Sequence, residues 1–200
     1  MSTESAQLFF SLLAIAAGIG SLAYLGLWIA SRLGSARAAE VGGAVADSAP
    51  WLAFVVAATA TVGSLYFSEV AHFVPCRLCW FQRVAMYPLS VVLLVGAIRR
   101  DPGLPWYVGP IALVGAGVAA YHTLIEWKPE LDTGACELFG PSCSDIWFRE
   151  FGFLTLASMA LIGFLTILLL MFVRFPDTLE SSSGPSDDRA NADPIQETAS

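Results

Sequence analysis

The chain has few charged side chains for its length. Only 14% of its 200 residues are Asp, Glu, Lys or Arg, whereas 56% are hydrophobic. A soluble globular domain carries about 25% charged residues. The shortage of charge, together with a mean hydropathy of +0.66, excludes an ordinary soluble domain and indicates an integral membrane protein with one helical domain.

Basic residues are scarce and scattered. The chain has 10 Lys and Arg, 17 Asp and Glu, and two His, for a net charge of −7. Much of the acid lies in the C-terminal tail, so the net charge by itself says little about nucleic acid. Because no run of basic residues occurs either, we expect no nucleic-acid partner.

The first six residues also have no Lys or Arg, and they include Glu4. A secretory signal peptide begins with basic residues and has a short apolar core. Here the start is acidic and the apolar run that follows is too long. We therefore expect an uncleaved membrane helix at the N-terminus.

Five apolar runs are long enough to cross a membrane, which takes about 20 apolar residues in a helix. They lie at about residues 8–30, 51–70, 80–98, 106–127 and 152–173. Residues 31–49 combine Arg32 and Arg37 with small residues and predict a loop. Pro88 inside the third run predicts a kink that neighbouring helices tolerate.

The C-terminal residues 176–200 are rich in Ser, Asp, Pro and Ala and hold almost no large apolar side chains. Such a segment cannot bury enough surface to fold, so it predicts a disordered tail. The expected domains are therefore an N-terminal helix with its loop (1–49), a four-helix bundle with two cysteine segments (50–174) and an acidic tail (175–200).

The basic residues predict the orientation of the spans, because Lys and Arg favour cytoplasmic loops. If all five runs cross the membrane, one side of the membrane holds Arg32, Arg37, Arg99, Arg100 and Arg174. The other side holds Arg77, Lys128 and Arg149 among many acidic residues. The first side is expected to be cytoplasmic. The N-terminus and both cysteine segments are then extracytoplasmic, on the same membrane face.

Four cysteines occur in two close pairs, Cys76–Cys79 and Cys136–Cys143. Close pairs suit an oxidising compartment or a metal site, and two pairs can form a tetrahedral zinc site. The second pair, however, is spaced more widely than zinc knuckles use, and no His lies within either pair. Spacing and topology favour redox chemistry and leave structural disulfides and a metal site open.

The first pair lies at an expected helix start. Proline suits the first turn of a helix, and a helix from Pro75 would place Cys76 and Cys79 one turn apart on one side. Arg83, four residues after Cys79, would share that face. The helix N-terminus and the guanidinium both favour thiolate, the form that attacks disulfides.

Two further polar residues lie within apolar runs. Arg83 is about two turns into a membrane helix, where a charge is costly and usually serves a function; an arginine that snorkels to the interface is the structural alternative. His122 lies at the outer end of the fourth run, where a packing role is the alternative to a functional one.

The stretch Pro75-Cys-Arg-Leu-Cys-Trp-Phe-Gln-Arg83, followed by Met86-Tyr87-Pro88, resembles the DsbB-type membrane disulfide oxidoreductases, especially the BdbC-like branch of Gram-positive bacteria. These proteins pass electrons from protein thiols to a quinone. The resemblance covers about residues 51–173. It implies an all-α membrane protein with a four-helix transmembrane bundle of DsbB type, to which this chain adds one N-terminal transmembrane helix.

The resemblance also implies roles for the cysteines. Cys136 would form the mixed disulfide with a DsbA-like thioredoxin-fold partner, Cys143 would exchange with Cys76, and Cys79 would face the quinone. The short spacing of the second pair matches the Gram-positive branch.

Three residues are implied as contacts of the quinone. Arg83 would donate a hydrogen bond to a quinone oxygen and stabilise its negative charge. His122, in a His-Thr pair like that of the family, would exchange a proton or a hydrogen bond. Gln82 would contact the quinone or pack between helices, and residues Trp80, Met86 and Tyr87 would shape the pocket.

The expected activity is that of a protein-dithiol:quinone oxidoreductase in the cell membrane, supporting disulfide formation in exported proteins. The acceptor would be ubiquinone or menaquinone, and the quinone as electron sink makes a metal or flavin unnecessary. A related alternative is a protein like vitamin K epoxide reductase, although there the loop pair precedes the Cys-x-x-Cys pair and here it follows.

Two alternatives belong to other classes. A non-enzymatic membrane protein with a zinc site or structural disulfides would unfold on chelation or reduction and would consume no quinone. A transporter is the weakest alternative, since Arg83 is the only charge well inside a predicted span and no internal repeat is present.

Overall fold

The computed structural model describes residues 2–132 and 141–175. In these ranges the chain is helical and has no β-strand, apart from an isolated bridge between Glu150 and Leu154. The elements are α1 (Thr3–Arg32), α2 (Ala36–Asp47), α3 (Ala49–Leu65) with the π-helix η1 (Tyr66–Val70), α4 (Arg77–Arg99), α5 (Leu104–Trp127), the short η2 (Pro129–Leu131) and α6 (Leu156–Phe172). The predicted all-α membrane architecture is confirmed.

Among the described residues, four helical segments are long and apolar enough to cross a membrane: α1, α3 with η1, α4 and α5. The fifth predicted span corresponds to α6, which is apolar but only 17 residues long. It begins later than predicted because Thr155 forms a capping box with Ser158, and residues 152–154 precede this cap.

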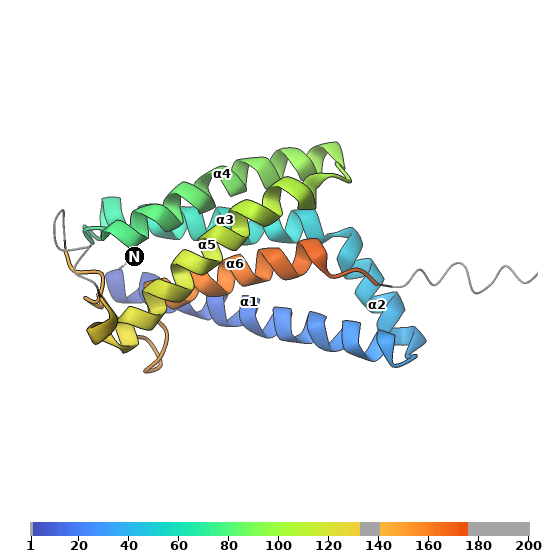
Figure 1. Cartoon of the computed structure of the whole chain (residues 1–200), viewed down its shortest axis with the longest axis horizontal. Helices are drawn as coiled ribbons and strands as arrows, with labels where there is room; N and C mark the ends of the chain where they lie inside the picture. The colour runs from blue at the N-terminus through green and yellow to red at the C-terminus, as the bar shows by residue number, and fades with distance from the viewer. Residues whose placement is uncertain (1, 133–140, 176–200) are drawn as a thin grey trace, which may run out of the picture.

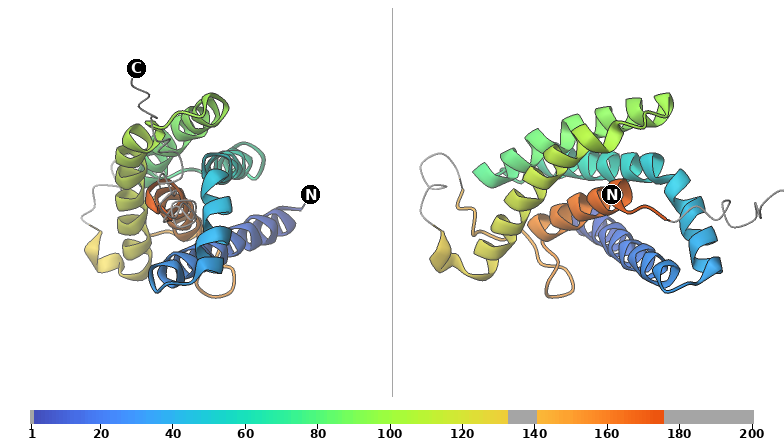
Figure 2. Two further views of the ribbon diagram at one scale, coloured as in Figure 1. Left: turned by 90° about the vertical axis from the view of Figure 1, so that its right-hand side faces the viewer. Right: turned by 45° about the vertical axis from the view of Figure 1, so that its right-hand side comes forward.

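The helices form an elongated bundle around α6 (Figures 1 and 2). Viewed along its length, α6 lies in the middle, with α5, α3 and α1 packed around it and α4 beyond, against α3 and α5. The N-terminal ends of α4 and α6 and the C-terminal end of α5 meet at one end of the bundle. Cys76 at the start of α4 and Cys143 beside it lie at this end, and α2 lies at the other.

The prediction of a loop at residues 31–49 was wrong, because α2 occupies most of it. Ser35 caps this helix by accepting a hydrogen bond from the Ala38 N–H. Alanine has the highest helix propensity and outweighs the Gly42-Gly43 pair here. The loop signal came from small residues, which are compatible with either structure.

Helix α1 is fixed to the bundle along its length. Four hydrogen bonds join it to α6 and the residues that follow: the Ser11 hydroxyl to the Met159 sulfur (3.8 Å), Ser21 with Thr166 (2.9 Å), the Tyr24 hydroxyl to the Val173 carbonyl (3.2 Å) and the Trp28 indole N–H to the Arg174 carbonyl (3.1 Å). Near its start, Phe10 lies so close to Gly63 of α3 that a Cβ there would come within 2.9 Å of the ring. The predicted N-terminal helix is thus an integral part of the fold.

Helices α5 and α6 approach closely where glycine faces an aromatic ring. A Cβ added to Gly115 would lie 2.3 Å from the ring of Phe164, which is fully buried. Small residues at helix contacts permit such approaches in membrane proteins. The contact fixes the position of α5, which carries His122.

The helix contact at Gly115 yields a stability prediction. Gly115→Ala should destabilise the protein by about 1–3 kcal/mol, because the added Cβ would lie 2.3 Å from the Phe164 ring and the ring or the helices must shift. Gly117→Ala is the matched control, since a Cβ at Gly117 meets nothing within 4 Å. Melting temperatures in detergent test both variants; equal melting temperatures would contradict the packing described here.

Candidate redox site

Cys76 forms the N-cap of α4. The helix begins at Arg77, two residues later than predicted from Pro75, because the Cys76 sulfur itself accepts a hydrogen bond from the Cys79 N–H at 3.3 Å. A sulfur at this position receives the partial positive charge of the helix N-terminus. The sequence thus places the first cysteine of the pair where a thiolate is stabilised.

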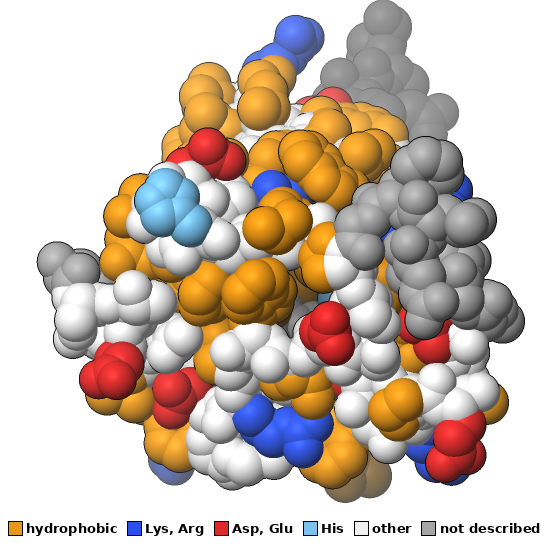
Figure 3. Space-filling model, turned by 90° about the vertical axis from the view of Figure 1, so that its left-hand side faces the viewer, with side chains coloured by type: hydrophobic (Ala, Val, Ile, Leu, Met, Phe, Trp, Pro, Cys, Tyr) orange, Lys and Arg blue, Asp and Glu red, His pale blue; other side chains and the backbone are white. Residues whose placement is uncertain are grey.

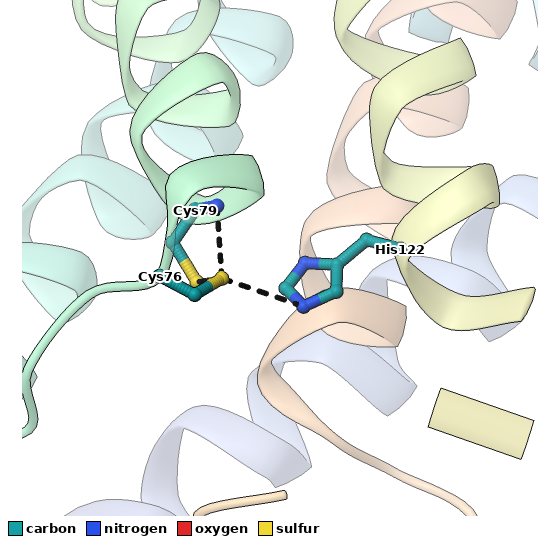
Figure 4. A group of neighbouring side chains, drawn as sticks. All are labelled: Cys76, Cys79 and His122. Atoms are coloured by element: carbon teal, nitrogen blue, oxygen red, sulfur yellow. Dashed lines mark hydrogen bonds between the residues drawn. The ribbon is translucent and has the colours of Figure 1, made fainter. Parts of the chain in front are cut away.

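Cys76 and Cys79 are free cysteines whose sulfurs lie 2.8 Å apart. A covalent S–S bond measures about 2.05 Å, so the pair is reduced and needs only a small movement to close. Figure 4 shows both sulfurs on the side of α4 that faces α5. The prediction that they lie one turn apart on the same side is confirmed.

His122 of α5 lies against this pair. Its Nε2 is 3.7 Å from the Cys76 sulfur and 3.1 Å from the Cys143 carbonyl oxygen, and its Nδ1 is 3.0 Å from the Gln82 amide nitrogen. Because the Gln82 amide donates to Nδ1, the neutral ring carries its proton on Nε2. That N–H faces both the Cys76 sulfur and the Cys143 carbonyl, so Gln82 orients the imidazole as a donor toward Cys76.

Glu126 was not identified from the sequence, although it lies four residues after His122 on the same face of α5. Its side chain is buried, with one carboxylate oxygen 4.0 Å from Nε2 of His122. The other oxygen accepts a hydrogen bond of 2.6 Å from the Thr155 hydroxyl at the start of α6. The i, i+4 spacing was the available signal, but burial of this carboxylate depends on the α5–α6 packing.

Cys143 is disulfide-bonded and fully buried. It forms a small cluster with Cys76 and Ile125. Cys143 of the second pair is therefore packed directly against the first pair, at the same end of the bundle. Cys136 lies outside the described residues.

Arg83 is held inside the protein by α3. Its Nε donates to the Ser64 hydroxyl at 2.9 Å and its Nη2 to the Ser64 carbonyl at 3.0 Å. The Tyr87 hydroxyl also bonds Ser64, and the guanidinium lies 5.2 Å from the centre of the Trp80 ring. These contacts fix the cation between α3 and α4, whereas a snorkelling arginine would extend into water.

A cavity of about 260 Å³ opens beside Cys79 and Arg83. Gln82, Met86 and Tyr87 also line it, together with apolar residues of α1, α3 and α6. Trp147 covers its outer end and stacks on Phe73, with ring centroids 4.8 Å apart. Cys76 does not line this cavity, so the two cysteines differ: both pack in the cluster around Cys143, and Cys79 also faces the cavity.

The environment of Cys76 changes its acidity. The hydrogen bond with the Cys79 thiol lowers the pKa of Cys76 to about 4; burial acts in the opposite direction, and His122 supports the lowering. At neutral pH the reduced pair is therefore a thiolate at Cys76 beside a thiol at Cys79. A thiolate is the nucleophile in disulfide exchange.

The group formed by Cys76, Cys79 and His122 also suggests a metal site. Ligand atoms of Cys76, Cys79 and His122 all lie within 4.8 Å of one another. In a tetrahedral zinc site with Zn–S bonds of about 2.3 Å, two sulfurs lie about 3.8 Å apart, which is wider than the 2.8 Å found here. Cys143 is in a disulfide and supplies no thiolate, so the geometry fits a thiol–thiolate pair better than a zinc site.

The acidity of Cys76 gives a prediction. In the reduced protein, the ultraviolet absorbance of the thiolate should be present at neutral pH and disappear as the pH falls through about 4. Cys76→Ser is the control and should lack this titration. Cys79→Ala removes the hydrogen bond that lowers the pKa of Cys76 most, so the midpoint of the Cys76 titration should rise in this variant. A midpoint near the ordinary thiol value of about 8.5 in the wild type would contradict the described contacts.

The region that contains these residues is similar to known proteins. The family model described as "Disulfide bond formation protein DsbB" matches residues 46–174. "Disulfide bond formation protein C" of Bacillus subtilis is 39% identical over 121 residues, which are 60% of this chain and 88% of the relative. No solved structure matches.

Two other relatives carry similar names. "Probable disulfide formation protein C 2" of Bacillus cereus is 36% identical over 61% of this chain and 87% of its own length. "Probable disulfide formation protein" of Deinococcus radiodurans is 44% identical over 50% of this chain and 67% of its own length. Since the matched region contains both cysteine pairs and the polar residues around them, the chain belongs to the DsbB family of disulfide bond formation proteins and is a multi-pass membrane thiol–disulfide oxidoreductase.

Proposed function

We propose that the protein reoxidises a DsbA-like thioredoxin-fold partner and passes the electrons through its two cysteine pairs to a membrane quinone. One observation carries this proposal. The free pair lies between two surroundings, with Cys76 beside the disulfide-bonded Cys143 and Cys79 beside a cavity that contains a fixed guanidinium. A relay needs this separation, because electrons must enter at one sulfur and leave at the other.

The proposed location is the cell membrane, with both cysteine segments extracytoplasmic. The five basic residues that predict the cytoplasmic side include Arg99 and Arg100 at the end of α4, opposite to Cys76 at its start. The cysteine end also exposes large apolar side chains, among them Val74 and Trp147. Figure 3 views this end and shows apolar side chains among charged ones, a surface suited to a protein partner.

In the proposed sequence of exchanges, a thiolate of the partner attacks the Cys136–Cys143 disulfide and forms a mixed disulfide at Cys136. The second partner thiolate attacks the partner's sulfur of that bond, releasing the oxidised partner and leaving Cys136 and Cys143 reduced. Cys143 then attacks Cys76 of an oxidised Cys76–Cys79 pair, and Cys136 resolves the product. This restores the second disulfide and leaves Cys76 and Cys79 as the reduced pair described here.

The residues around Cys76 support this exchange. Cys76 is the leaving thiolate when the mixed disulfide with Cys143 resolves, and a thiol of low pKa leaves readily. The α4 N-terminus and the N–H of His122 both face its sulfur. Gln82 and the buried pair of Glu126 and Thr155 hold the imidazole and the start of α6 around it.

The residues around Cys79 fit a quinone. A quinone takes up two electrons and two protons, so that dithiol and quinone become disulfide and quinol. Arg83 provides N–H donors at the cavity end next to Cys79, Tyr87 donates to Ser64 beside it, and the rest of the lining is mostly apolar. A preorganised donor of this kind stabilises negative charge on an acceptor oxygen without reorganising. Ubiquinone and menaquinone both match this description.

The proposal predicts that purified protein reduces a quinone when a reduced thioredoxin-fold partner is supplied, and that Cys79→Ser abolishes this. Arg83→Gln should reduce quinone turnover by about 10²-fold, the scale for loss of one oxyanion donor. Arg99→Gln, the same substitution at the opposite end of α4, is the matched control. Quinone absorbance measures the turnover.

Two results would overturn the proposal. One is that wild-type protein consumes neither ubiquinone nor menaquinone. The other is a bound zinc ion that holds Cys76, Cys79 and His122 and whose chelation unfolds the protein, which would favour the metal site instead.

A further inference from the structure

The added helix α1 forms one wall of the cavity beside Cys79. Four of its residues line the cavity, Phe10, Leu13, Ala14 and Ala17. Their spacing of i, i+3, i+4 and i+7 is that of one face of a single helix. This helix lies outside residues 46–174, the part of the chain that the family model matches. The wall is therefore contributed by a part of this chain that lies outside the region shared with the family model.

The wall is anchored at both ends. Phe10 packs against Gly63 of α3 and against the Phe67 ring, with centroids 5.6 Å apart. Further along, α1 is hydrogen-bonded to α6 through Ser21 and Thr166. Between these anchors lie Ala14 and Ala17, whose small side chains leave room for the cavity.

The cavity is long, and its two ends differ in chemistry. Cys79 and Arg83 lie at one end, near Ser64 of α3. Along α3 the lining continues to Val55, nine residues away, which is about 13 Å at 1.5 Å per residue. This stretch is lined by apolar side chains and Thr59, with α1 and α6 opposite. A ligand that fits has a polar, reducible head and an apolar tail.

We propose that α1 binds the isoprenoid tail of the quinone, with Ala14 and Ala17 setting the space available to it. The inference rests on the proposed function, since it concerns the same acceptor. Without α1, this side of the groove between α3 and α6 would be open to lipid. With α1 in place, residues of α1, α3 and α6 line the part of the cavity remote from Cys79.

Binding of two quinones that differ only in their tails tests the inference. Ala17→Phe puts a ring into the tail region, so it should weaken binding of a long-tailed quinone about tenfold relative to the same head group with a methyl in place of the tail. Ala17→Leu should have a smaller effect in the same direction. Ala16→Phe is the matched control, because Ala16 is exposed on the outer side of α1 and does not line the cavity.

Affinity is measured by titrating each quinone into the protein in detergent and monitoring the quenching of tryptophan fluorescence. The melting temperature without quinone verifies that each variant is folded. The inference would be overturned if folded Ala17→Phe kept the wild-type ratio of the two affinities, whether both were unchanged or both fell equally. If the wild type binds and reduces neither quinone, the proposed function itself fails. If the wild type reduces both but Ala17→Phe keeps the wild-type ratio, only the role of α1 fails.

Discussion

The hydrogen bond from the Cys79 N–H to the Cys76 sulfur is the interaction on which the site depends. It caps the N-terminus of α4 at Cys76 and stabilises a thiolate there. The second sulfur lies one turn further along the helix. The two sulfurs are therefore adjacent to each other, but only Cys79 also lines the cavity. Cys76 lies in the cluster with Cys143, and Cys79 lies at the cavity. The chemical asymmetry of the pair follows from helix geometry.

The rest of the bundle holds this asymmetry in place. Gly115 lets α5 approach α6 closely, and this approach accompanies the burial of His122 and Glu126 beside the start of α6. Ser64 of α3 binds Arg83 through both its hydroxyl and its carbonyl, so the guanidinium is fixed although it lies in an apolar part of the chain. Each polar group of the site is thus paired within the protein, as burial in a membrane requires.

The N-terminal helix changes how the cavity relates to the membrane. In the described structure α1 is joined to α6 and α3 by specific contacts, so it is a component of the bundle and more than a membrane anchor. Phe10, Leu13, Ala14 and Ala17 of α1 line the cavity, whereas Leu22 is exposed on the outer surface.

Much of this protein could be predicted from its sequence. Long apolar runs specify helices because a membrane leaves no other partner for the backbone, and the Cys-x-x-Cys spacing at a helix start brings two sulfurs together by local geometry alone. Residues 31–49 were misjudged because small residues suit both loops and helices. The tertiary structure alone decided which distant residues meet: Ser64 with Arg83, Glu126 with Thr155, and α1 with the cavity. These contacts depend on how helices pack, and the packing of one helix on another is not encoded in the local pattern of either.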